Sequence, residues 1–204
     1  MLAERRERRD GLTVLHLAQP VEGGVARVIT DLVGAQRREG VRVVVGCPAG
    51  GSLPRAAAAA GAEVEHWDAL RDPGPRVPAE ARRAYQLIRR VRPDLVHAHS
   101  AKAGLAARLA LRGRIPTVYQ PHAWSFEAVE GQAARLARGW ERWAARWTHR
   151  VLCVSEAERR TGERAGVSAP WTVVPNGVDL SCFTAAAAAG GGTAAGTDAD
   201  AEAA

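Results

Sequence analysis

The chain has 204 residues, of which 47% are hydrophobic and 25% are charged, a balance typical of a globular domain with its own core. Its 28 Lys and Arg against 22 Asp and Glu give a net charge of +6, which fits a phosphorylated substrate, an anionic membrane surface or nucleic acid. No apolar run approaches the roughly 20 residues of a membrane-spanning helix, and the charged start lacks the apolar stretch of a secretory signal. We therefore expect a cytoplasmic protein.

The amino-terminal part predicts a basic arm followed by a strand, a glycine turn and a helix. Residues 1–11 form the arm, and residues 12–18 are an apolar run rich in Val and Leu, as in a buried strand. Gly23 and Gly24 then interrupt the pattern before apolar residues recur at helical spacing. Such a turn can admit an anion to backbone N–H groups at a helix N-terminus, or it can be a tight turn without a ligand.

The rest of the chain alternates between predicted strands and helices. The expected strands cover residues 41–47, 62–67, 94–100, 117–120, 151–154 and 171–174. The expected helices cover residues 52–61 with Ser52 as N-cap, a segment around 84–91, residues 101–112 and 132–150, and a segment that starts at the capping box Ser155–Glu158. This alternation predicts an α/β fold: a doubly wound parallel sheet with helices on both faces.

Three segments between or after these elements stand out. Residues 68–78 and 121–131 are loops long enough to be candidates for function. Residues 184–204 are rich in Ala and Gly, have no large apolar side chain and predict a disordered tail.

Polar residues follow several predicted strands directly, and the carboxyl ends of parallel strands share one edge of the sheet. We expect the edge to gather Gly23, Gly24, His97, His99, His122 and Asn176. Ligands bind beyond this edge in doubly wound folds, so these residues are the first candidates for a site.

His97 and His99 lie two residues apart on a predicted strand, so both side chains leave the same face of the sheet. An H-x-H pattern can supply half of a metal site, with His122 as a third ligand. The only carboxylate nearby is Asp94, at the far end of the strand. A polar rim that binds a ligand, or a structural role for His97, fits these residues better than a metal. The three cysteines, Cys47, Cys153 and Cys182, lack C-x-x-C spacing and indicate neither zinc nor a disulfide framework.

The loop after residue 120 holds His122, Trp124 and Phe126. A neutral imidazole there can exchange hydrogen bonds with a sugar hydroxyl or a phosphate, and aromatic rings pack against apolar sugar faces. The alternative for His122 is a capping or core histidine. Lys102, the single lysine, opens the predicted helix 101–112, which follows the strand 94–100. There it can reach a phosphate or remain an ordinary surface residue.

A tryptophan-rich stripe marks the predicted helix 132–150. Its members fall at helical offsets and are Leu136, Trp140, Trp143 and Trp147, with arginines over the remaining surface. Such a stripe is most often core packing, and the alternative is a basic helix that lies on an anionic bilayer.

Five segments occur in order along the chain: QPVEGGVARV, PDLVHAHSAKAG, VYQPHAWSF, VLCVSEAE and VVPNGVD. Their order and rough spacing resemble the N-terminal, acceptor-side domain of GT-B glycosyltransferases of family four. The resemblance covers residues 12–183 and implies a Rossmann-like half of a GT-B fold. It also implies retaining transfer of a hexose from a nucleotide sugar to a saccharide or lipid-linked acceptor, in glycan or cell-envelope polysaccharide synthesis.

The resemblance also implies roles for individual residues. The turn with Gly23 and Gly24 faces the donor diphosphate, and His122 lies by the reacting sugar as the catalytic candidate. The cleft-lining candidates on the acceptor side are His99, Ser100, Lys102, Trp124 and Asn176. No metal, no cofactor beyond the nucleotide-sugar co-substrate and no nucleic-acid partner are expected.

One departure concerns the other half of the fold. Family members carry nucleotide contacts on a C-terminal domain, including two glutamates with seven residues between them, and no two glutamates here have that spacing. We expect an acceptor half that is a truncated product, a fragment, or one half of a split enzyme whose partner supplies a separate donor domain. It should have little activity alone and can contact the inner membrane face peripherally. The alternatives are a non-catalytic lipid- or saccharide-binding module of this fold and an unrelated phosphate-binding α/β protein.

Overall fold

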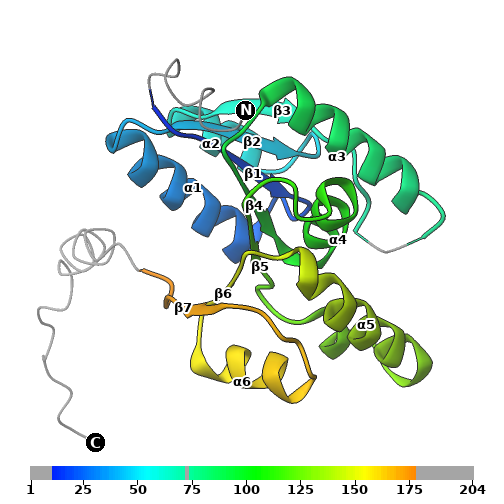
Figure 1. Ribbon diagram of the computed structural model, residues 1–204. Coiled ribbons are helices and arrows are strands. Elements are labelled where there is room, and N and C mark those ends of the chain that lie inside the picture. The colour runs from blue at the N-terminus through cyan, green and yellow to red at the C-terminus, as the bar shows by residue number, and fades with distance from the viewer. Residues whose placement is uncertain (1–10, 72–73, 178–204) are drawn as a thin grey trace, which may run out of the picture.

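The computed structural model describes residues 11–71 and 74–177. It shows a parallel sheet with helices packed against both faces (Figure 1). Its seven strands lie in the order β3-β2-β1-β4-β5-β6-β7, and every neighbouring pair is parallel. The predicted doubly wound α/β fold is therefore confirmed. The expected arm, apart from Gly11, and the expected tail lie outside the described residues.

Strands and helices alternate along the described chain, as the sequence pattern predicts. The strands are β1 (Thr13–Ala18), β2 (Arg42–Cys47), β3 (Glu63–His66), β4 (Leu95–His99), β5 (Thr117–Gln120), β6 (Arg150–Cys153) and β7 (Trp171–Val173). The helices are α1 (Gly23–Arg38), α2 (Leu53–Ala59), α3 (Val77–Val91), α4 (Ser100–Leu111), η2 (Ser125–Glu127), α5 (Gly131–Ala144), η3 (Ala145–Trp147) and α6 (Glu156–Arg164). Within residues 11–71 and 74–177, no helix has the length and apolar character needed to cross a bilayer.

Two element boundaries differ from the prediction in ways that matter for the site. Gly23 and Gly24 form the first turn of α1 instead of the loop before it. The predicted helix over 132–150 ends at Ala144 and continues only as the short η3. The helix stops early because His149 donates its backbone N–H to Thr117 and so already belongs to the sheet.

The two faces of the central strands differ in chemistry. Leu15 and Leu17 of β1 and Val96 and Ala98 of β4 pack with α3 and α4 in one apolar core. Residues on the opposite face of β1 and β2 pack with α1 and α2 in a second core. Because side chains alternate along a strand, the α1 face of β4 receives the two histidines of the H-x-H pattern.

The sheet reverses its winding between β1 and β4. From β1 the chain proceeds to β2 and β3 on one side, whereas from β4 it proceeds to β5, β6 and β7 on the other. The helices that follow β1 and β4 therefore leave in opposite directions, and a crevice at the carboxyl ends of such strands is where doubly wound folds bind ligands.

Candidate functional site

The first turn of α1 follows β1 at this point of reversal. Gly23 has φ +72°, a conformation that favours glycine. Apart from the neighbouring residues and backbone of its own helix turn, no described atom lies within 4 Å of a Cβ placed on Gly24, so no other element packs against that position. The N-cap residue Glu22 makes no side-chain hydrogen bond to the helix. The N–H groups of this turn are thus open to an anion.

The Glu22 carboxylate is held away from the helix by Ser52, whose hydroxyl donates to it at 2.7 Å. Ser52 occupies the N-cap position of α2 as predicted, but its side chain does not cap that helix. The expected capping contact is therefore wrong. The serine instead joins the turn before α1 to the turn before α2, since its backbone N–H donates to Val21 O at 3.1 Å.

Strained backbone marks the ends of the next two strands. Ser100 has φ +66° directly after β4, and His122 and Ala123 have φ +57° and +129° just after β5. A non-glycine residue in this region costs about 1–3 kcal/mol, and such residues cluster at functional sites. The other described non-glycine residues with positive φ, Arg92 and Arg112, are C-caps of helices, where this conformation is ordinary.

Histidines from three strand regions meet beside this strained backbone. His16 Nδ1 lies 2.9 Å from His99 Nε2, and His99 Nδ1 lies 3.1 Å from His122 Nε2. His16 Nε2 lies 2.9 Å from the side-chain oxygen of Gln36 on α1. The sheet register explains the meeting, because His16 is paired with His97 and Ala18 with His99. His16 and Gln36 were not among the predicted site residues.

Burial keeps these imidazoles neutral. It lowers the pKa of His16 to about 4 and that of His122 to about 4. Burial and the neighbouring histidines hold the pKa values of His97 and His99 well below the ordinary range. At neutral pH each ring therefore has one N–H and one lone pair.

His97 lies beside these rings, with its centroid 4.0 Å from that of His99. Its Nε2 is buried without a hydrogen-bond partner in the described part of the chain. One nitrogen from each of His16, His97 and His99 lies within 4.8 Å of the others, a spacing that could hold a metal ion. No carboxylate joins this group, so a divalent charge buried there would lack an anion to balance it.

The loop that carries His122 is fixed by Glu158 of α6. The Glu158 carboxylate accepts the backbone N–H of Ala123 at 3.0 Å and that of Val154 at 2.7 Å. The predicted capping box is present only in part: Ser155 Oγ accepts the Glu158 N–H at 3.1 Å, but the glutamate side chain turns to the histidine loop. Glu158 is therefore a residue that positions His122.

Trp124 lies in the core and not in a cleft. It is 1% exposed, its ring stacks on Phe126 with centroids 5.5 Å apart, and Trp171 meets it edge-on. Its Nε1 donates to Glu158 O at 2.8 Å. The expectation that Trp124 and Phe126 offer rings to a sugar is wrong, because both rings are used to anchor the loop.

Lys102 is also buried. This contradicts both predictions for it, a cation that reaches a phosphate and an ordinary surface residue. Its side chain is 4% exposed, and its Nζ lies 2.8 Å from Glu80 Oε2 of α3. The other Glu80 oxygen accepts the N–H of Leu70, in the segment before α3. The lysine thus joins the first turn of α4 to that segment and does not line an open surface.

Of the predicted site residues, the structure brings together His99 and His122 and places Ser100 directly after His99. Gly23 and Gly24 follow the neighbouring strand β1 at the same edge. Asn176 is exposed after β7, the outermost described strand, and β5 and β6 separate it from β4. It does not join the histidines.

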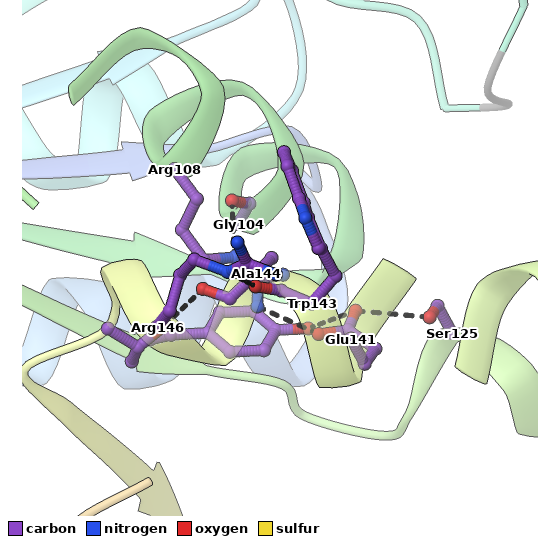
Figure 2. A network of polar contacts seen from close by, with 9 residues as sticks. Gly104, Arg108, Ser125, Glu141, Trp143, Ala144 and Arg146 are labelled. Atoms are coloured by element: carbon purple, nitrogen blue, oxygen red, sulfur yellow. Dashed lines mark hydrogen bonds and ion pairs between the residues drawn. The ribbon is translucent and has the colours of Figure 1, made fainter. Parts of the chain in front are cut away.

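A buried polar network stands behind the histidine loop (Figure 2). Figure 2 shows Arg108 on α4 extending toward Glu141 on α5, with Ser125 on the other side of the carboxylate. Glu141 Oε1 accepts from Ser125 Oγ at 3.2 Å and from Tyr119 at 3.3 Å. Sequence reasoning missed Arg108 and Glu141. The only pattern that could have indicated them is that each charged residue falls on an otherwise apolar face of its helix.

The tryptophan-rich stripe on α5 is not core packing throughout. Leu136 is 76% exposed and Trp143 is 42% exposed, whereas the buried residues of this helix are Ala134, Glu141 and Ala144. Trp143 contacts Trp147 edge-on with centroids 4.2 Å apart. The core interpretation therefore fails for the most exposed members of the stripe.

Comparison with known proteins agrees with this geometry. The protein family described as Glycosyltransferase Family 4 matches residues 22–181 of this chain. An Escherichia coli relative, a UDP-Gal:α-D-GlcNAc-diphosphoundecaprenol α-1,3-galactosyltransferase, is 33% identical over 107 residues, which are 50% of this chain and 28% of the relative.

Solved structures share the fold. HepE from Anabaena, solved with UDP and glucose, matches with a TM-score of 0.67 and 24% identity over 84% of this chain and 46% of that chain. A glycosyltransferase from Rickettsia africae matches with a TM-score of 0.68 and 16% identity over 87% of this chain and 46% of that chain. This chain thus spans less than half the length of these proteins. From the family match over most of its length, the chain belongs to glycosyltransferase family 4.

Proposed function

We propose that this chain is the acceptor-side half of a retaining, nucleotide-sugar-dependent hexosyltransferase in glycan or cell-envelope polysaccharide synthesis. The observation that carries the proposal is that the α1 glycine turn, the hydrogen-bonded pair His99 and His122, and Ser100 all lie at the carboxyl ends of three adjacent parallel strands. Positive φ at Gly23, Ser100 and His122 marks the same edge.

The chemistry of this edge suits transfer from a nucleotide sugar. The open N–H groups of the α1 turn supply a place for the donor diphosphate, whose negative charge grows as the sugar departs. The neutral ring of His122 supplies a hydrogen bond to the sugar. The nucleotide contacts would come from a donor domain, either further along the protein or on a separate chain.

Transfer assays test this proposal. The chain is assayed alone and joined to the donor domain of a family relative, with UDP-galactose or UDP-glucose and a polyprenyl-diphosphate-linked GlcNAc acceptor. The joined protein should transfer sugar with retention of the anomeric configuration, which NMR of the product reads. The isolated chain should show little transfer, and EDTA should leave the rate of the joined protein unchanged because no metal is proposed.

Variants sharpen the assay. His122→Ala in the joined protein should lower transfer by about 100-fold or more, whereas Gln132→Ala, an exposed change on α5, should leave it intact. Absence of transfer by the joined protein with each of these donors would contradict the proposal, and strong transfer by the isolated chain would contradict the half-enzyme interpretation.

A second function, peripheral lipid binding, is favoured by the surface of α5. Exposed Leu136 and Trp143 lie among exposed arginines of α5 and of the short η3 that follows it, which are Arg135, Arg138, Arg142 and Arg146. Apolar side chains among cations suit insertion into an anionic bilayer surface. This surface would bring a lipid-linked acceptor to the enzyme, or would serve a non-catalytic lipid-binding module.

Vesicle sedimentation tests the second function. The chain should sediment with phosphatidylglycerol vesicles and far less with phosphatidylcholine vesicles, and high salt should weaken the binding. Leu136→Glu with Trp143→Glu should abolish sedimentation, while Val129→Glu, an exposed apolar residue before α5, serves as the matched control. Equal binding to both vesicle types would count against this function.

A further inference from the structure

Three consecutive hydrogen bonds connect an amide on α1 to the histidine after β5. They join Gln36 Oε1 to His16 Nε2 at 2.9 Å, His16 Nδ1 to His99 Nε2 at 2.9 Å, and His99 Nδ1 to His122 Nε2 at 3.1 Å. We call these four residues the histidine chain. His16 and His99 are completely buried, so water cannot replace either partner.

The amide oxygen decides the direction of every bond in the histidine chain. A carbonyl oxygen only accepts, so His16 donates from Nε2 and accepts at Nδ1. His99 must then donate from Nε2, which leaves its Nδ1 as an acceptor. His122 must in turn donate from Nε2. This arrangement uses one proton on each ring, which matches their neutral state.

The remaining ring nitrogen of His122, Nδ1, is left for a ligand. His122 is half-buried, and its Nδ1 is not among the described polar side-chain atoms that are buried without a partner. With Nε2 engaged by His99, Nδ1 is the ring atom that a ligand can reach.

We propose that His16 and Gln36 are positioning residues that hold His122 in the tautomer protonated on Nε2, so that Nδ1 accepts a hydrogen bond from a hydroxyl group of the bound sugar. The ligand part rests on the proposed function. A nitrogen with a lone pair cannot donate to a diphosphate oxygen. His122 therefore recognises the sugar hydroxyl, and the diphosphate must find its donors elsewhere, such as the first turn of α1.

Direct observation of the ring protons tests the arrangement in the chain as it stands. Long-range proton–nitrogen NMR spectra of ¹⁵N-labelled protein at pH 7 should show His16, His99 and His122 protonated on Nε2 and not on Nδ1. A proton on Nδ1 of His122 or His99 would overturn the proposal, because the hydrogen bonds of the histidine chain would then have their donors and acceptors exchanged.

Zinc addition separates the proposal from the metal alternative. A metal bound by His16, His97 and His99 would compete with the His16–His99 hydrogen bond for the ring nitrogens. Equimolar zinc chloride should leave the ring nitrogen shifts of His16 and His99 unchanged. Large shifts of both would show that these rings are ligands and would overturn the proposal.

Variants at Gln36 test the positioning role itself. Gln36→Leu removes the acceptor, so the fraction of His122 protonated on Nδ1 should rise by about tenfold. Gln36→Glu keeps an oxygen that only accepts and should preserve the wild-type tautomer. Gln132→Leu makes the same substitution at an exposed glutamine and should change nothing. An unchanged His122 tautomer in Gln36→Leu would overturn the role of Gln36.

The two proposals fail separately. If the joined protein transfers no sugar, the tautomers of the isolated chain are unaffected by that result. If His122 carries its proton on Nδ1, transfer by the joined protein can still be observed, and only the positioning proposal falls.

Discussion

Arg108 and Glu141 form an ion pair of 2.8 Å between α4 and α5 in which both side chains are 1% exposed. The Arg108 guanidinium also lies 4.0 Å above the ring of Tyr119, on β5. Because Glu141 accepts from Ser125 as well, the pair joins two helices, the strand before His122 and the loop after it. The position of the histidine loop therefore depends on a buried charge pair outside the site.

Removal of one member of this pair should be strongly destabilising. Arg108→Ala leaves the Glu141 carboxylate buried without its cation, so we expect a loss of about 3–5 kcal/mol in the free energy of unfolding, measured by urea denaturation. Arg27→Ala breaks the exposed Arg27–Asp31 pair and should change stability by less than about 1 kcal/mol. Similar effects of the two variants would argue against a structural role for the buried pair.

Lys102 should behave as a structural residue and not as a phosphate ligand. Lys102→Met leaves Glu80 buried without its cation, and we expect a loss of about 3–5 kcal/mol by the same measurement. Because Glu80 also accepts the Leu70 N–H, proteolysis within the segment before α3 should become faster. A stable variant with unchanged proteolysis would show that the pair contributes little.

Gly24 in the first turn of α1 and Gly104 of α4 should respond differently to substitution by alanine. Gly24→Ala adds a methyl group to open space, so stability should stay within about 1 kcal/mol of the parent or rise. Donor binding by the joined protein should nevertheless weaken, because the methyl group occupies the approach to the N–H groups. Gly104→Ala would run into the Tyr119 ring and should lose about 1–3 kcal/mol or more.

Thermal denaturation and nucleotide-sugar titration of the same two variants separate these effects. If Gly24→Ala binds the donor normally, the glycine is there for the turn alone and the diphosphate does not approach at this position.

The free energy of unfolding of this protein should fall as the pH drops below about 6.5, because its buried histidines stay neutral in the folded state. Unfolded histidines take up protons below about pH 6.5, whereas folded His16 and His122 stay neutral to about pH 4. The unfolded state then binds more protons, so the free energy of unfolding falls as pH drops from 6.5 toward 4. Each such histidine contributes a slope of about 1.4 kcal/mol per pH unit.

Urea midpoints at pH 7, 6 and 5 measure this slope. His16→Gln should make it shallower, while Gln132→Leu, at an exposed position, should leave it unchanged. A midpoint that does not move between pH 7 and 5 would contradict the neutral, buried state of the histidine chain.

The sequence by itself determined the architecture and the edge of the sheet at which the candidate site residues lie. Alternating strand and helix patterns require parallel strands, and parallel strands place all their carboxyl ends together. That rule correctly located the Gly23–Gly24 turn, His99 and His122, because each follows or ends a strand. It misplaced Asn176 relative to the others, since the rule states which edge a residue joins but not how many strands lie between.

Only the tertiary structure decided what these side chains touch. The partners of Lys102, Arg108 and His16 are 22, 33 and 83 residues away along the chain, and periodicity carries no information over such separations. Trp124 was misplaced for the same reason, because a loop residue can point into a core that other segments build. Local patterns follow from backbone geometry within a few residues, whereas the pairing of buried charges and rings follows from which elements pack together.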